Sequence, residues 1–283
     1  MKIGIVGPAD RAVAWEEHLR PHRAVEEVII SGSLKGIGNV DACLLFDESE
    51  NQLDSLLKSI QSGFHSFLIS KLPTDYKAIE KIYHAAEEAN VLLQFSHWPT
   101  LAPASQWMTK KIAKPRFIQI IREVNYTEFL ETGAAIEDLW IDELAFCLKW
   151  IDGAVHNLDL KTVKLQSDKI HALHLYVRFD SGATSNIYIN ASSQQNSHRR
   201  FASDKSFLLH CDVQSQTVRL GQESSGKHLF FDKQEFDPTK AAEMAATQFI
   251  KAIQLKKSTL YNGYDLQKLA TEIQKVREKI SRA

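Results

Sequence analysis

The chain has 283 residues, of which 44% are hydrophobic, so it is long enough for one large or two ordinary domains with apolar cores. Its 34 basic and 35 acidic side chains nearly cancel, which leaves no global field to attract nucleic acid or anionic lipid. No apolar run approaches the roughly 20 residues of a membrane span. We therefore expect neither a nucleic-acid partner nor a membrane.

The cysteines and the start of the chain bear on the compartment. Cys43, Cys147 and Cys211 are far apart in apolar surroundings, as buried reduced thiols are, and they show no metal-binding spacing. The first strand leaves no room for a signal peptide. We expect a cytoplasmic protein without a metal.

The first hundred residues alternate short apolar strands with amphipathic helices. Strands are expected at 2–6, 25–31, 40–46, 64–69 and 91–96, and helices at 11–19, 51–62 and 74–89. Strands separated by helices of this length are typical of a doubly wound parallel sheet. The pattern predicts an α/β fold class, with an N-terminal Rossmann-type dinucleotide-binding domain over residues 1–98.

The pattern changes after residue 98. Helices are expected at 104–112, 136–150, 239–255 and 265–280, and strands at 117–124, 158–165, 171–179, 184–191, 206–211, 217–220 and 228–231. Tight turns between one-sided strands predict an open, mainly antiparallel sheet with one covered face. We expect a C-terminal α+β domain over residues 99–283 for substrate binding and dimerisation. The Ser-His-Arg-Arg segment 197–200 is expected to be a loop whose positive charge can receive an anionic substrate; alternatively, it is a surface loop without a ligand.

The segment after the first strand contains part of a dinucleotide-binding fingerprint. In G-x-G-x-x-G/A, a tight turn brings backbone amides against a pyrophosphate at a helix N-terminus. Gly7 supplies the tight turn, Pro8 follows it, and Ala12 is small enough for helix–strand packing. Ala9 replaces the middle glycine, where the backbone comes closest to the pyrophosphate. These four residues are predicted to contact the cofactor.

Two further turns bear on the cofactor. Residues 31–35 lack the acidic group that grips a ribose 2′-hydroxyl. Ser33 and Lys35 there can instead meet a 2′-phosphate, which favours NADP over NAD, or they form a turn with an exposed lysine. Phe46 opens the turn after the third strand and is also predicted to contact the cofactor. The three acids among residues 47–50 would repel a pyrophosphate unless they point outward.

Motifs in and after residues 70–97 resemble the glucose–fructose oxidoreductase and inositol dehydrogenase family, Gfo/Idh/MocA. The similar segments are Ser-Lys-Leu-Pro at 70–73, an alanine-rich helix end at 82–91 and Gln-Phe-Ser-His at 94–97. The resemblance implies NAD(P)-dependent hydride transfer to or from a sugar-like or polyol substrate, in a homodimer or higher homo-oligomer formed through the open sheet. It places Lys71 near the nicotinamide and substrate, and His97 in the cleft as a neighbour of the nicotinamide or the substrate. The alternative for Lys71 is an ordinary solvated lysine.

A second family motif carries an aspartate and, four residues later, a histidine on one helix. The matching residues here are Asp138 and Asp142, so the resemblance implies that Asp138 orients substrate and Asp142 occupies the base position. An isolated aspartate is a poor base at pH 7. A spacing of four puts both carboxylates on one helix face, where like charges raise one pKa; alternatively, both are solvated charges at a helix start.

These departures from the family motifs leave a second function open. Ala9, the acidic turn and Asp142 are also compatible with a catalytically inactive relative that acts as a ligand-binding or assembly protein.

Overall fold

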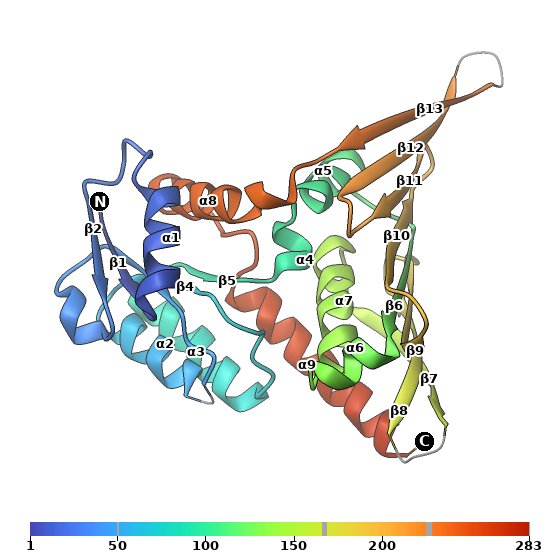
Figure 1. The fold of residues 1–283 in the computed structure, drawn as a ribbon, viewed down its shortest axis with the longest axis horizontal. Helices are drawn as coiled ribbons and strands as arrows, with labels where there is room; N and C mark the ends of the chain where they lie inside the picture. The colour runs from blue at the N-terminus through green and yellow to red at the C-terminus, as the bar shows by residue number, and fades with distance from the viewer. Residues whose placement is uncertain (50, 166–168, 225–227, 283) are drawn as a thin grey trace. The chain divides into compact units, whose positions relative to one another are not determined.

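The computed structural model describes residues 1–49, 51–165, 169–224 and 228–282, and Glu50 of the acidic turn lies outside these ranges. The chain forms two compact units (Figure 1). The first contains Met1–Leu101 with Thr239–Thr271, and the second contains Ala102–Pro238 with Glu272–Ala283. This division differs from a single boundary after residue 98, because residues 239–271 return to pack with the N-terminal unit.

The first unit is built on a parallel sheet. Its strands are β1 (Lys2–Val6), β2 (Glu27–Ser31), β3 (Ala42–Leu45), β4 (His65–Leu68) and β5 (Leu93–Phe95). They are ordered β2-β1-β3-β4-β5, and every neighbouring pair is parallel. The strand order reverses between β1 and β3, and the carboxyl ends of strands at such a reversal form the ligand crevice of doubly wound folds. The predicted Rossmann-type sheet is confirmed.

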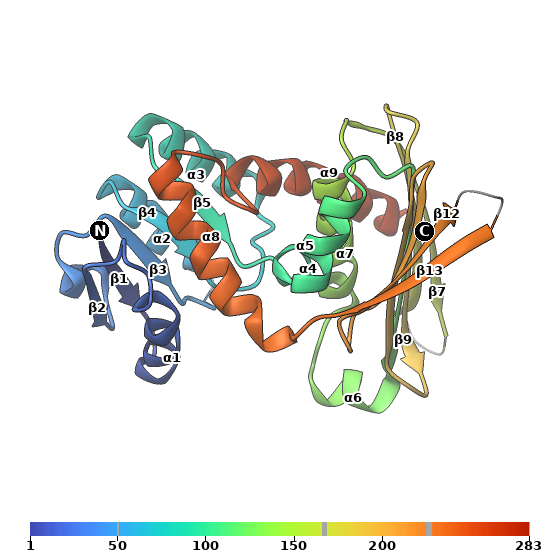
Figure 2. The same ribbon diagram turned by 90° about the horizontal axis from the view of Figure 1, so that it is seen from above.

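Helices cover both faces of this sheet. Helices α1 (Ala9–Leu19) and α8 (Ala241–Leu255) lie on one face, and α2 (Gln52–Gln61) and α3 (Tyr76–Ala89) lie on the other (Figures 1 and 2). The core beneath α1 and α8 contains an aromatic chain in which Trp15 and Phe249 each lie 5.6 Å from Phe67 between ring centres. Helix α8 therefore belongs to the first unit through apolar packing.

A short connection joins β2 to β3. It contains a single 3₁₀ turn, η1 (Leu34–Ile37), whose Ile37 is buried. Ile37 packs directly on β1, since a Cβ atom added at Gly4 would lie 2.5 Å from its Cδ1 atom. The turn η1 therefore lies beside the carboxyl ends of the strands, next to β2.

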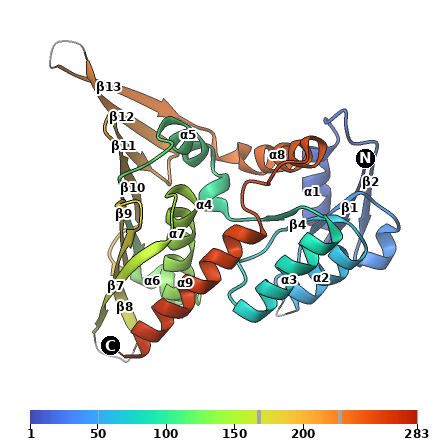
Figure 3. The same ribbon diagram turned by 180° about the vertical axis from the view of Figure 1, so that it is seen from behind.

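The second unit contains an eight-stranded sheet in the order β13-β12-β11-β10-β6-β9-β8-β7. The strands are β6 (Phe117–Asn125), β7 (Val155–Lys164), β8 (Ile170–Phe179), β9 (Thr184–Ser193), β10 (Ser197–Ser203), β11 (Phe207–Asp212), β12 (Thr217–Ser224) and β13 (His228–Glu235). Only the β6–β9 pair is parallel; the other neighbours are antiparallel. Helices α5 (Pro103–Lys111) and α7 (Ile136–Trp150) cover one face (Figure 3). The open, mainly antiparallel sheet is confirmed.

Two α-helices and one strand were not predicted. They are α4 (Trp98–Leu101), α6 (Tyr126–Glu131) and strand β10. Helix α6 follows β6 without a break because the Asn125 side chain accepts hydrogen bonds from the amides of Thr127 and Glu128 and caps the helix. Helix α9 (Gly263–Ser281) ends in the second unit, where Arg277 Nε lies 2.7 Å from Glu137 Oε1 of α7. Within the described residues, no helix has the length and apolar character needed to cross a membrane.

Candidate functional site

The turn between β1 and α1 is tight and requires glycine. Gly7 has φ = +153°, and its amide donates to the carbonyl oxygen of Ser31 at 3.1 Å. A Cβ atom at this position would lie 2.6 Å from the Cβ atom of Phe46. Residues other than glycine are therefore excluded at position 7, both by the positive φ angle and by the close approach of Phe46. The structure thus brings together two of the predicted cofactor residues, Gly7 and Phe46.

The amino end of α1 is suited to an anion. Helix α1 begins at Ala9, two residues earlier than predicted, because Pro8 at the N-cap has φ = −59° and leads directly into the first turn. Pro8 at the N-cap provides no side-chain hydrogen bond to the first-turn amides, so their N–H groups can serve as donors for a ligand. Ala9 is exposed, and Ala12 is completely buried against the sheet. Despite the methyl group of Ala9, this turn fits a dinucleotide phosphate.

The acidic turn after β3 directs its two described carboxylates differently. Asp47 accepts hydrogen bonds from the Ser49 amide at 3.0 Å and the Ser55 hydroxyl at 2.8 Å, and so faces the start of α2. Burial opposes ionisation of Asp47, but these hydrogen bonds outweigh it and hold its pKa below the ordinary value. Glu48 instead reaches α1, where its Oε1 lies 2.6 Å from Arg11 Nη1. One of the two acids therefore faces the predicted phosphate turn.

The predicted adenosine-side residues lie beside η1. Ser33 and Lys35 are both exposed, and the Ser33 amide donates to the Ser31 hydroxyl at 3.2 Å. Their exposure is compatible with both sequence-based alternatives, a 2′-phosphate site and a simple surface turn.

Lys71 and His97 follow neighbouring strands but have different environments. Lys71 is exposed just beyond β4, and the backbone before it is held by the Ser70 amide, which donates to Ser96 Oγ at 3.0 Å. His97 is only 1% exposed, with Nδ1 2.8 Å from Thr100 Oγ1 and its ring centre 4.6 Å from that of Tyr261. Lys71 is thus accessible to a ligand, whereas His97 packs inside the unit and its contact with a cofactor stays a prediction.

The second unit contains a buried ion pair between α7 and β10. Glu143 and Arg200 are both 0% exposed. Arg200 donates from Nε to Glu143 Oε2 at 3.0 Å and from Nη2 to Oε1 at 3.1 Å, and its Nη1 donates to Ser105 Oγ at 3.1 Å. The prediction of a positively charged loop at 197–200 was wrong. This segment is a strand in which Arg200 points inward and is neutralised by Glu143.

Two more basic residues surround Glu143. His198 Nε2 lies 3.0 Å from Glu143 Oε1, and Arg122 Nη1 of β6 lies 3.5 Å from the same oxygen. Burial would raise the pKa of Glu143, but the charges of Arg200, His198 and Arg122 hold that pKa well below its usual range. Burial lowers the pKa of His198. Glu143 is therefore ionised throughout the neutral pH range.

Asp142 lies at the edge of this cluster. Its Oδ2 is 3.9 Å from Arg122 Nη1, and 39% of its side chain is exposed. Burial and the neighbouring charge of Glu143 raise the pKa of Asp142 to about 7, against the opposing charges of Arg122 and Arg200. Asp138 contributes less than Glu143, so the carboxylate that chiefly perturbs Asp142 is not the one that the sequence motif indicated. The result is a partly exposed carboxyl group that titrates near neutrality.

Sequence reasoning missed Arg122 and Glu143, and it placed Arg200 in a surface loop. One signal was available, because Asp142 and Glu143 together interrupt an apolar stretch of α7 and buried charges require partners. The partner itself is 57 residues away along the chain and is found only through the fold.

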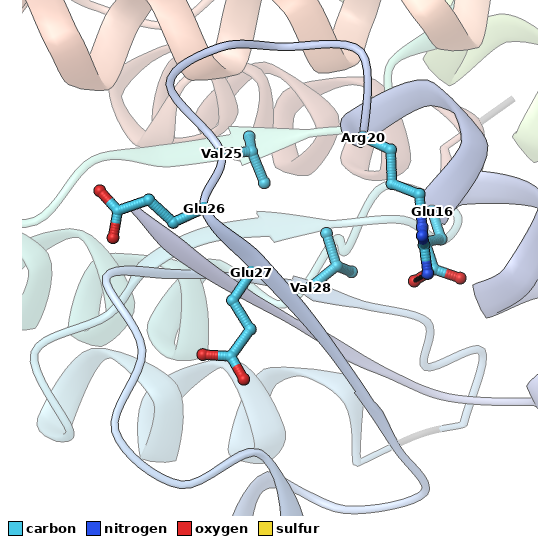
Figure 4. Close-up of a pocket in the computed structure, with 6 residues that line it drawn as sticks. All are labelled: Glu16, Arg20, Val25, Glu26, Glu27 and Val28. Carbon is cyan, nitrogen blue, oxygen red and sulfur yellow. Dashed lines mark hydrogen bonds and ion pairs between the residues drawn. The ribbon is translucent and has the colours of Figure 1, made fainter.

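Two other features of the described residues bear on the nature of the site. No group of three or more His, Cys, Asp or Glu residues in the described ranges is placed to hold a metal ion. A hollow of about 390 Å³ beside β2 is lined by Glu16, Arg20, Val25, Glu26, Glu27 and Val28 (Figure 4). It lies at the amino end of β2 and is rich in carboxylates, so it is unsuited to the phosphates of a dinucleotide.

Comparison with known proteins places this arrangement among oxidoreductase folds. No family model and no curated protein matches the chain. Among solved structures, UDP-N-acetylglucosamine 3-dehydrogenase GnnA from Acidithiobacillus ferrooxidans is 14% identical with a TM-score of 0.82, covering 97% of this chain and 96% of that one. An NAD binding oxidoreductase from Klebsiella pneumoniae is 12% identical with a TM-score of 0.83, covering 100% and 98%. The chain has the fold of these oxidoreductases.

A third similar structure is levoglucosan dehydrogenase in complex with NADH, which is 10% identical with a TM-score of 0.77, covering 100% of this chain and 97% of that one. The similarity extends over both units. The fold implied by the Gfo/Idh/MocA resemblance is therefore confirmed, while identities this low carry no information on substrate.

Proposed function

We propose that this chain is an NAD(P)-dependent oxidoreductase that transfers a hydride between a nicotinamide and the carbinol carbon of a sugar-like or polyol substrate. The observation that carries the proposal is Asp142, a partly exposed carboxyl group with a pKa of about 7. A base whose pKa lies near the working pH takes a proton efficiently. The objection that an ordinary aspartate is too weak a base at neutral pH therefore does not apply to Asp142.

The proposed roles follow from the side chains. In the oxidation direction, the Asp142 carboxylate takes the hydroxyl proton, and the carbinol carbon gives up a hydride, with its two electrons, as the C=O bond forms. The Lys71 ammonium group stabilises the developing negative charge on the oxygen, and Asp138 binds a substrate hydroxyl. The nicotinamide supplies the hydride acceptor. The first-turn amides of α1, together with Gly7, Pro8, Ala9 and Phe46, would hold the cofactor's pyrophosphate and adjoining groups.

We propose that the cofactor is NADP in preference to NAD. We also propose that the protein is located in the reducing environment of the cytoplasm. Ser33 and Lys35 are exposed beside η1, where a hydroxyl and an ammonium group suit a 2′-phosphate. The three cysteines are unpaired and buried, as thiols in a reducing compartment are.

Cofactor titration tests this proposal. Trp15 lies 5.9 Å from Phe46 between ring centres, so binding at the β1–α1 turn is expected to quench tryptophan fluorescence. We expect NADPH to bind at micromolar concentration and more tightly than NADH. Lys35→Gln should weaken NADPH binding about tenfold and leave NADH binding unchanged, because only NADPH carries the 2′-phosphate. Failure of both nucleotides to bind at millimolar concentration would contradict the proposal.

A catalytically inactive relative that acts as a ligand-binding or assembly protein remains the second candidate. The Glu48 carboxylate at the phosphate turn favours it, because a negative charge there opposes pyrophosphate binding. The same titration separates the two functions.

We further propose a homodimer formed through the uncovered face of the eight-stranded sheet. Leu208, Gly221 and Phe231 are neighbours across β11, β12 and β13. Leu208 is 56% and Phe231 is 72% exposed on this face. The residues before and after Leu208 in β11 are less exposed and point to the opposite face, toward the helices. Apolar sheet surface of this kind is usually covered by a partner.

Phe231→Asp tests the dimer. It is expected to raise the dimer dissociation constant at least about tenfold, because it would bury an unpaired charge in the contact. Phe230→Asp is the matched control, since Phe230 is 50% exposed on the other face of the same strand. Sedimentation equilibrium measures both. A wild-type chain that is monomeric at micromolar concentration would refute the dimer.

A further inference from the structure

We propose that Glu48 is an electrostatic latch on the phosphate site, which restrains dinucleotide binding by holding Arg11. On binding, Arg11 exchanges the Glu48 carboxylate for a cofactor phosphate. This inference rests on the proposed function, because it requires a dinucleotide at the β1–α1 turn.

A chain of contacts places Arg11 at this turn. The Arg11 guanidinium carbon lies 5.3 Å from the centre of the Phe46 ring, and Phe46 in turn packs against Gly7. Arg11 is the third residue of α1, within the uncapped first turn of the helix. The guanidinium group is therefore held over Phe46 beside the amides that suit a pyrophosphate.

Glu48 is the described acid placed to compete for Arg11. The other described acid of the turn, Asp47, is occupied by Ser49 and Ser55 at the start of α2. The Glu48 carboxylate contacts Arg11 Nη1 at 2.6 Å, and no further hydrogen bond or ion pair of its side chain is found within the described ranges. Helix α1 follows β1, and the loop that carries Glu48 follows β3. Because β1 and β3 are adjacent in the sheet, the side chains of Arg11 and Glu48 can reach each other.

The strength of this pair is suited to a latch. The side chains of Arg11 and Glu48 are 43% and 63% exposed, and exposed ion pairs are weak. A phosphate group offers a guanidinium two parallel charge-assisted hydrogen bonds, which are stronger than this single contact. The cofactor phosphate should therefore displace Glu48 from Arg11. Breaking the Arg11–Glu48 pair costs part of the binding free energy of the cofactor.

Glu48→Gln tests the latch through cofactor affinity, read from tryptophan fluorescence with NADPH and NADH. The variant should bind about three- to tenfold more tightly than the wild type at low salt, and the gain should shrink at about 0.5 M salt as screening increases. Arg11→Gln should weaken binding. In the Arg11→Gln background, Glu48→Gln should gain less than about twofold, because the latch acts through Arg11.

Glu27→Gln is the matched control. Glu27 is 49% exposed and forms an ion pair with Lys2 at 2.8 Å, so the substitution removes the same charge from a similar exposed pair. Glu27 lies at the amino end of β2, away from the phosphate turn, and its variant should bind cofactor like the wild type. A gain equal to that of Glu48→Gln would show a general charge effect and overturn the latch.

The remaining outcomes distinguish the latch from the proposed function. Wild-type binding with no change in Glu48→Gln overturns the latch alone. Binding by Glu48→Gln but not by the wild type at millimolar nucleotide supports the restraint by Glu48 and contradicts the proposed function of the wild-type chain. No binding by either protein at millimolar nucleotide overturns both.

Discussion

Replacement of Arg200 by alanine is expected to lower the free energy of unfolding by about 3–5 kcal/mol. The reason is that Glu143 would remain completely buried and ionised after losing its bidentate partner. Arg200 also covers the Phe146 ring, with its guanidinium carbon 4.3 Å from the ring centre, so the truncation leaves a cavity as well. Urea denaturation followed by circular dichroism measures the effect.

Arg199→Ala is the control for this substitution. Arg199 is the neighbouring residue of β10, but it is 43% exposed, and its closest carboxylate oxygen, in Glu123, is 3.6 Å away. Its removal should cost less than about 1 kcal/mol. The double variant Glu143→Leu, Arg200→Met should recover most of the lost stability, because neither charge is then buried alone. An Arg200→Ala variant as stable as Arg199→Ala would show that the buried pair contributes little.

The buried Glu143–Arg200 pair also explains why strand β10 could not be predicted from the sequence. Strand β1 and helix α7 have the predicted bounds because their apolar residues alone indicate the period of each element. In β10, the inward positions include His198 and Arg200, so the alternation that marks a half-buried strand is hidden. The polar inward side chains are acceptable only because α7 supplies Glu143.

Some features of the candidate site likewise follow from local sequence patterns, whereas others depend on the fold. The glycine requirement at Gly7 follows from a local fingerprint, and the structure adds only that Phe46 enforces it. The Arg11–Glu48 pair joins residues 37 positions apart, and it depends on the adjacency of β1 and β3, which local patterns do not encode. The titration of Asp142 depends chiefly on burial and on its sequence neighbour Glu143, whose ionisation is secured by residues of β6 and β10.

Asp142→Asn is expected to lower the turnover rate by a factor of about 10²–10⁴ on a sugar or polyol that the wild type oxidises, because the amide cannot take the hydroxyl proton. Cofactor affinity should be unchanged, since Asp142 lies in the second unit and the predicted cofactor residues lie in the first. In the wild type, oxidation should slow as the pH falls below about 7, where Asp142 becomes protonated. Steady-state rates across pH 5–9, with fluorescence titration of the cofactor, measure both. Equal turnover in the variant would refute the role of Asp142 as the base.

The same substitution reports the Asp142 pKa without any substrate. Because that pKa is about 7 in the folded chain and 3.8 ordinarily, the folded state binds the proton more tightly than the unfolded state. This contribution to stability is complete below the ordinary value and is lost as the pH rises through about 7. Asp142→Asn removes the titration, so its stability relative to the wild type should increase between about pH 4 and pH 8 in urea denaturation. Asp138→Asn retains Asp142 and should keep most of the wild-type pH dependence, because Asp138 contributes less than burial and Glu143 to the raised pKa of Asp142. If Asp142→Asn also keeps it, then Asp142 titrates like an ordinary aspartate, and the physical basis for its role as a base is lost.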